Sequence, residues 1–280
     1  MSNARVFLLS LSAMLAFAAN SLLCRVALKH TSIDAASFTA IRIVSGALVL
    51  GSIVRWQGGK SAPAGSWISA LALFSYAAAF SFAYVSLTAA SGALLLFGAV
   101  QATMIGVGLF QGERLRGVQW LGLASAAAGL VGLLLPGLSA PPWQGSVLML
   151  VAGAAWGLYS LRGKGSGDPL RVTAGNFLRA GAFAVVLGVA MWSRASLDGP
   201  GIACAIASGG IASGLGYAVW YAALPGLKVA SAATVQLSVP MFAAVGGILL
   251  LGEPFTLRLA LASITILGGI ALVVVPRRSA

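Results

Sequence analysis

The chain has 280 residues, of which 59% are hydrophobic and only 8% are charged. A soluble globular domain carries about 25% charged residues to cover its surface, so this composition excludes an ordinary soluble protein. The formal net charge of +12 comes mostly from single Lys and Arg residues between apolar segments, without the basic stripe of a nucleic-acid-binding surface. We therefore expect a membrane protein with no nucleic-acid partner, whose cations set its topology and contact lipid head groups.

Ten apolar segments are long enough to cross the hydrocarbon core of a bilayer, which takes about 20 helical residues. In chain order they cover residues 6–24, 35–54, 67–87, 90–111, 117–136, 143–161, 172–193, 199–221, 227–251 and 257–275. Proline and glycine residues fall in the gaps, which are too short for a soluble domain. The sequence thus predicts an all-α polytopic membrane protein with ten transmembrane helices.

The first segment resembles a cleavable signal peptide, because Arg5 precedes the apolar residues and Ala16-Phe17-Ala18 resembles a cleavage site. We expect a retained helix instead, since this segment has a counterpart in the second half of the chain.

The basic residues predict the orientation. With a cytoplasmic N-terminus, eleven of the 17 Lys and Arg residues fall on the inside and four fall on the outside, namely Arg25, Lys29, Arg194 and Arg258. This excess predicts that both termini are cytoplasmic in a bacterial inner membrane. Five tryptophans agree, because they lie near span ends, where their rings favour the membrane interface: Trp56, Trp67, Trp120, Trp143 and Trp192.

The two halves of the chain resemble each other, with residues 1–139 as a first repeat and 140–280 as a second. Residues 90–136 align without gaps to 230–276 and share the pairs Gly112-Glu113 and Gly252-Glu253. Upstream, residues 17–21 align to 156–160, and Arg42 aligns to Arg179. Because five spans is an odd number, the second repeat must enter the membrane from the opposite side. Such inverted repeats are typical of secondary transporters, since each half can adopt the conformation of the other.

These features resemble the EamA-type drug/metabolite transporter superfamily. The shared features are ten spans in two repeats, an aromatic-x-x-Asn/Tyr pattern in the first span of each half (Phe17 to Asn20 and Trp156 to Tyr159), and Gly-Glu after the fourth span. The resemblance implies a secondary active or facilitative transporter that exports small metabolites, above all amino acids. The aromatic amino-acid exporters of the YddG type are similar in length and layout. Because Tyr159 stands where the first half has Asn20, we expect the halves to contact substrate differently.

Aromatic and neutral polar side chains within the spans are the candidates for substrate binding. Tyrosine hydroxyls in a bundle need partners, which a hydrated cavity supplies, although such rings also serve helix packing. Amides can bond both ends of a zwitterion and can equally bond between helices. The predicted substrate-binding residues are Asn20, Tyr76, Tyr84, Gln101, Trp156, Tyr159, Tyr217, Trp220, Gln236 and Ser238. Pro240 removes a backbone donor within the ninth span and predicts a hinge.

Charged residues are rare within the predicted spans. Arg42 and Arg179 are expected there, either as gates or substrate-carboxylate contacts, or as structural charges that snorkel or bond to backbone carbonyls. His30 and the acids are expected in loops or at span ends: Asp34, Glu113, Asp168, Asp198 and Glu253. The two glutamates each precede a span, whose helix N-terminus they are expected to complement. Transport is therefore expected to proceed without a buried carboxylate as proton carrier.

Enzymatic signatures are absent from the sequence. A single histidine cannot form a metal site of the H-E-x-x-H kind, and we expect no cofactor, no metal and no catalytic residues. Cys24 and Cys204 are expected to be free thiols. The expected partners are the substrate and membrane lipids, with the chain acting as a monomer. Two alternatives remain open: a carrier for multidrug or other metabolite efflux, and a membrane scaffold that transports nothing.

Overall fold

The computed structural model describes residues 2–58, 64–112, 114–137, 140–163, 168–227 and 235–274. Within these ranges, eight helical segments are long and apolar enough to span a membrane, and two shorter apolar helices accompany them. The prediction of an all-α polytopic membrane protein with ten helical spans is therefore confirmed.

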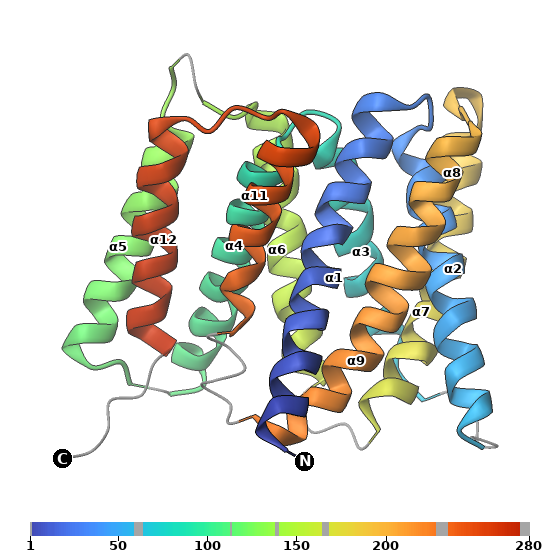
Figure 1. The fold of residues 1–280 in the computed structure, drawn as a ribbon, viewed down its shortest axis with the longest axis horizontal. Coiled ribbons are helices and arrows are strands. Elements are labelled where there is room, and N and C mark those ends of the chain that lie inside the picture. Colours follow the sequence, from blue (N-terminus) through green and yellow to red (C-terminus); the bar gives the residue numbers. More distant parts are fainter. Residues whose placement is uncertain are drawn as a thin grey trace.

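The first five helices follow one another with short connections (Figure 1). They are α1 (Asn3–His30), α2 (Ala35–Trp56), α3 (Trp67–Tyr84), α4 (Ala89–Phe110) and α5 (Gly117–Leu134). The second five spans are α6 (Trp143–Gly163), α7 (Pro169–Ala190), a composite span, α11 (Ser238–Leu251) and α12 (Leu257–Val274). The composite span consists of α8 (Gly199–Ile206), the π-helical segment η2 (Ala207–Leu215) and α9 (Gly216–Ala223).

The helices begin where polar side chains can satisfy their first backbone N–H groups. Asp34 accepts hydrogen bonds from the backbone of Ala36 and Ser37 at the start of α2. Asp168 and Asp198 do the same for α7 and α8. An acceptor at this position stabilises a helix by about 1 kcal/mol. These three acids thus lie in the loops because they cap the helices that follow.

The two ends of the bundle can be told apart by the chain termini. We call the lower end in Figure 1, where α1 begins and α12 ends, the terminus end, and we call the opposite end the far end. The first helix is longer than its apolar segment indicates, because α1 continues to His30. The prediction that Arg25 and Lys29 lie in an outside loop is therefore wrong: both belong to α1, where Arg25 is buried.

Small residues allow close helix contacts. α5 and α12 pack together at one edge of the bundle (left in Figure 1). There a Cβ atom on Gly122 would lie 2.5 Å from the carbonyl oxygen of Gly269. The helix pairs α4–α11 and α2–α7 also pack against each other. In all three pairs the partners are the helices that the sequence alignment makes equivalent.

The outer surface suits a bilayer. Large apolar side chains such as Val185, Val186 and Val189 on α7 are exposed. The five tryptophans expected at the membrane interface are also exposed, each within three residues of a helix end: Trp56, Trp67, Trp120, Trp143 and Trp192. The two cysteines are free, as expected.

Candidate functional site

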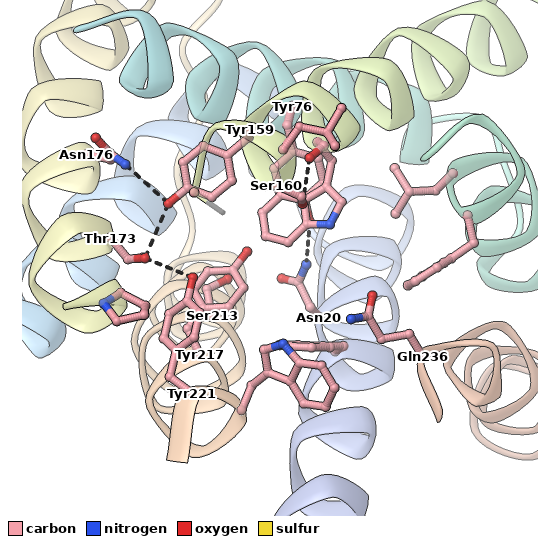
Figure 2. A pocket seen from close by; sticks show the side chains of 18 of the residues that line it. Asn20, Tyr76, Tyr159, Ser160, Thr173, Asn176, Ser213, Tyr217, Tyr221 and Gln236 are labelled. Atoms are coloured by element: carbon pink, nitrogen blue, oxygen red, sulfur yellow. Dashed lines mark hydrogen bonds between the residues drawn. The ribbon is translucent and has the colours of Figure 1, made fainter. Parts of the chain in front are cut away.

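A cavity of about 530 Å³ lies between helices of the two halves (Figure 2). Its walls come from α1, α3 and α4 in the first half and from α6, α7, η2 and α9 in the second. None of the described residues that line it is charged. Aromatic rings and neutral hydrogen-bonding groups dominate, including Asn20, Tyr76, Gln101, Trp156, Tyr159, Thr173, Asn176, Tyr217, Trp220, Tyr221 and Gln236.

The cavity extends from the middle of the bundle to the terminus end. Its lining includes Gly163 at the end of α6, Pro169 at the start of α7, and Leu224 and Leu227 just after α9. No described residue from the helix ends at the far end lines the cavity. The cavity therefore extends toward the terminus end and not toward the far end.

The first polar group of the cavity is centred on Tyr76. Its hydroxyl accepts hydrogen bonds from Arg42 Nη2 at 3.1 Å and from Asn20 Nδ2 at 3.4 Å. Asn20 Oδ1 in turn accepts a hydrogen bond from Ser208 Oγ of the π-helical segment at 2.6 Å. Four spans, α1, α2, α3 and η2, are thereby joined through side chains.

The second polar group lies on the opposite wall and is centred on Thr173 (Figure 2). The hydroxyl of Tyr159 donates to Thr173 Oγ1 at 3.4 Å, and Thr173 Oγ1 is 3.0 Å from the hydroxyl of Tyr221. Asn176 Nδ2 donates to the hydroxyl of Tyr159 at 3.5 Å. In this group the hydroxyls and the amide bond to each other, and no Lys or Arg takes part in these bonds.

Trp156 lies between the two groups and joins their rings. Its ring centre is 5.4 Å from that of Tyr217 and 5.3 Å from that of Tyr159, both in stacked geometry. It also lies 4.8 Å from the ring of Tyr76. Phe17 reaches Tyr217 and Trp220 from α1. The rings provide an apolar surface suited to a flat, apolar part of a ligand.

Arg42 is buried behind the cavity wall with 2% of its surface exposed. Its guanidinium carbon lies 5.2 Å from the ring centre of Tyr76 and 4.9 Å from that of Phe80. Its Nη2 atom donates to Tyr76, whereas its Nη1 atom has no hydrogen-bond partner in the described part of the chain.

Arg179 is placed differently from its sequence counterpart. Its Nη1 atom donates to the backbone carbonyls of Ala64 and Gly175, both at 2.9 Å. It does not line the cavity. These bonds fit the structural alternative of the sequence analysis, in which the charge is held by backbone oxygens.

Of the ten predicted substrate-binding residues, the structure brings eight together around the cavity and leaves two outside. Tyr84 is fully buried below the far end and donates its hydroxyl to the carbonyl of Ala89. Ser238 donates to the carbonyl of Val235, in the turn before α11. Pro240 is the third residue of α11, and the helical conformation is interrupted at Leu237, three residues before it.

Several lining or bonded residues were missed by sequence reasoning. The sequence does not distinguish Thr173 and Ser208 as site residues, because single hydroxyls in spans commonly bond to their own backbone. Asn176 was missed because it lies only four residues after the predicted start of its span at residue 172, yet it is buried at the cavity wall. Among the described residues, no group of three or more His, Cys, Asp or Glu side chains could hold a metal.

A buried ion pair lies at the far end, outside the cavity. Arg25 Nε is 3.0 Å from Glu253 Oε1, and each side chain is 9% exposed. Arg25 Nη1 also donates to the carbonyl of Tyr84 at 3.0 Å, and Glu253 Oε2 accepts from the backbone N–H of Ala89 at 2.8 Å. Glu253 was expected to complement the span that follows it, and it instead bonds to the first residue of α4. The companion prediction for Glu113 lies outside the described residues.

Comparison with known proteins gives three similarities. Residues 143–275 match the EamA-like transporter family. An uncharacterised protein of Pseudomonas aeruginosa is 59% identical over 278 residues, which are 99% of this chain and 97% of the relative. A solved crystal structure shares the fold with a TM-score of 0.67, at 20% identity, over 97% of this chain and 98% of the other.

Proposed function

Because the chain belongs to the EamA-like transporter family, and is a membrane transporter and not an enzyme, we propose that it exports amino acids or similar small metabolites. Aromatic amino acids are the substrates we favour. The observation that carries this proposal is the neutral, ring-lined cavity of about 530 Å³ between the two halves. Cavities that bind small molecules commonly have volumes of about 300–1,000 Å³.

The chemistry of the lining supports a zwitterionic substrate with an apolar side chain. Amide and hydroxyl groups such as those of Gln101, Gln236 and Ser213 can bond a carboxylate or an ammonium group without fixing a charge. The stacked rings of Trp156 and Tyr217 offer a surface for an aromatic side chain. No Asp, Glu or His is among the described lining residues, which favours export down the substrate gradient over proton coupling.

Alternating access would follow from two inverted repeats, residues 1–139 and 140–280. The pairing of equivalent helices, α2 with α7, α4 with α11 and α5 with α12, is what a two-fold relation between the halves would give. With both termini in the cytoplasm, the terminus end is the inner side. The cavity then faces inward, as an exporter needs in order to load its substrate.

Contacts between the halves hold the far end closed in this conformation. The Arg25–Glu253 pair joins α1 to the segment before α12. At the same end of the bundle, Ser196 N donates to Asp34 Oδ2, and Ser32 N donates to Asp198 Oδ2. We take these contacts as the outer gate, which must break when the cavity opens outward.

Flux of radiolabelled amino acids through proteoliposomes of the purified protein tests the proposal. We expect time-dependent counterflow of at least one aromatic amino acid, competed by its unlabelled form, without need of an imposed pH gradient. Counterflow that is competed only by lipophilic cations or sugars would favour the carrier for drugs or other metabolites. No flux of any compound would favour the scaffold and contradict the proposal.

A further inference from the structure

The described part of the chain leaves Arg42 as a buried cation without an acidic partner. Each described acid is engaged elsewhere: Asp34, Asp168 and Asp198 cap helices, and Glu253 bonds to Arg25. A buried guanidinium without a counter-ion costs free energy, because burial removes its hydration. The bond to Tyr76 and the two rings offset part of this cost, yet Nη1 remains without a partner.

Tyr76 connects this cation to the cavity. The Tyr76 side chain lines the cavity, while its hydroxyl oxygen accepts from Arg42 and Asn20. Two accepted bonds occupy both lone pairs of the oxygen, so the hydroxyl proton is its only remaining bonding group. No acceptor for that proton is found among the described residues. Ser208 holds the Asn20 amide by its oxygen, which keeps the NH₂ group directed at Tyr76.

We propose, on the basis of the transport function above, that the Arg42–Tyr76 pair selects substrates that carry a carboxylate. The Tyr76 hydroxyl donates its proton to the carboxylate from the cavity wall, and Arg42 behind it supplies the positive charge. Arg42 is thus a positioning and selectivity residue that acts through Tyr76. A substrate that carries only an ammonium group meets a donor and a positive potential at this wall, and it is excluded.

The other wall lacks this arrangement, which gives the substrate a direction. The Arg179 guanidinium is bonded to the carbonyls of Ala64 and Gly175. The Thr173 group offers hydroxyl oxygens, which can accept from an ammonium group. The carboxylate therefore binds toward α3 and the amine toward α7.

Four compounds with one aromatic ring separate the contributions of the two charges. They are phenylalanine, phenylalanine amide, 3-phenylpropionate and 2-phenylethylamine. Binding is measured on the detergent-solubilised protein by quenching of tryptophan fluorescence, since Trp156 and Trp220 line the cavity. Flux is measured separately in proteoliposomes. We expect the two carboxylates to bind at least about tenfold more tightly than the amide and the amine.

Three variants test the roles of the two residues. Tyr76→Phe keeps the ring and should weaken carboxylate binding about tenfold, with the half-saturation concentration raised and the maximal flux retained. Arg42→Gln should abolish the preference for carboxylates, and Arg42→Lys should restore much of it because it retains the charge. Arg179→Gln, which removes a charge from the equivalent position of α7, should leave the preference unchanged.

The two measurements separate this inference from the proposed function. Carboxylate-selective binding without flux would uphold the inference and contradict transport. Flux or binding with equal preference for acid and amine would overturn the inference. The same holds if Tyr76→Phe and Arg42→Gln elute as folded protein and weaken the binding of all four compounds alike.

Discussion

Arg25 and Glu253 are 228 residues apart in the chain, yet their side chains meet at 3.0 Å at the far end of the bundle. The pair joins α1 of the first half to the segment before α12 of the second half and is buried, so it is little screened by salt. Its position opposite the cavity suits a contact that holds one conformation of a transporter and is lost in the other.

Loss of this ion pair should favour opening of the far end. Removing one partner of a buried pair costs about 3–5 kcal/mol, because the other charge remains buried. We expect Glu253→Gln to open the far end and to expose Cys24, which is fully buried one residue before Arg25. The rate at which a water-soluble maleimide labels Cys24, in a Cys204→Ala background, should rise at least about tenfold.

Asp168→Asn is the matched control for that experiment. It removes a helix-capping carboxylate from the terminus end of the bundle, where Asp168 caps α7 and takes no part in the contacts at the far end. Its labelling rate should stay close to that of the parent. Equal labelling of the Glu253→Gln variant and the parent would show that the ion pair does not hold the far end closed.

Trp156 should contribute to substrate binding more than a tryptophan at the membrane interface. It stacks on Tyr159 and Tyr217 inside the cavity, whereas Trp67 is exposed at the start of α3. Aromatic contacts contribute about 0.5–1.5 kcal/mol beyond the area that they bury. Trp156→Ala should raise the half-saturation concentration of counterflow about five- to tenfold, and Trp67→Ala should not. Equal effects of the two substitutions would contradict the proposal that the cavity binds the substrate.

Gly209 should be intolerant of any side chain. It lies in the π-helical segment, where an added Cβ atom would clash with the backbone carbonyl of Arg42 and with Ser45 Oγ. π-Helical segments are rare and are frequently found at functional sites. We expect Gly209→Ala to lower the free energy of unfolding by about 1–3 kcal/mol and to disturb Arg42.

Gly188→Ala on α7 is the comparison for Gly209→Ala, since no atom lies within 4 Å of the added Cβ there. It should leave the melting temperature unchanged or raise it slightly. If the two variants melt at the same temperature, the close approach of η2 and α2 does not contribute to stability.

Asp34 should make stability depend on pH. Burial by itself would raise the pKa of its carboxyl group, but hydrogen bonds from Ser37, Ser196 and Ala36 outweigh burial and lower this pKa below its ordinary value. The ionised form therefore stabilises the fold at neutral pH, and this contribution is lost as the pH falls through the lowered pKa. Asp34→Asn should melt below the parent at pH 7, and the difference should shrink toward pH 3. A difference that is constant with pH would contradict this role.

The ten spans could be predicted from sequence because each apolar segment must be buried in lipid or in the bundle, whatever its neighbours are. The ring of Trp156 could be assigned to the interior because it lies away from both ends of its predicted span, residues 143–161. Tyr76 and Tyr217 could be assigned to a cavity because tyrosine hydroxyls inside a helix bundle need partners, and both residues line the cavity. Such features depend on local pattern and on the thickness of a membrane.

Other features depend on contacts that no local pattern contains. Arg25 was expected in a loop because a charge usually ends an apolar span, and its burial depends on the distant Glu253 and on the carbonyl of Tyr84. Thr173 and Ser208 are single hydroxyls whose partners, Tyr221 and Asn20, lie on other helices. Tyr84 and Tyr76 are both tyrosines of α3, eight residues apart, so the sequence does not distinguish them. Tyr84 lies two turns nearer the far end, where the bundle is packed.

The most direct test of alternating access is to fix the far end shut. Cysteines are introduced as Arg25→Cys and Glu253→Cys in a background of Cys24→Ala and Cys204→Ala, and they are crosslinked with a short bifunctional reagent that a reductant can cleave. We predict that crosslinked protein in proteoliposomes shows no counterflow and that cleavage of the crosslink restores it. Counterflow that continues at the full rate through quantitatively crosslinked protein would contradict the account.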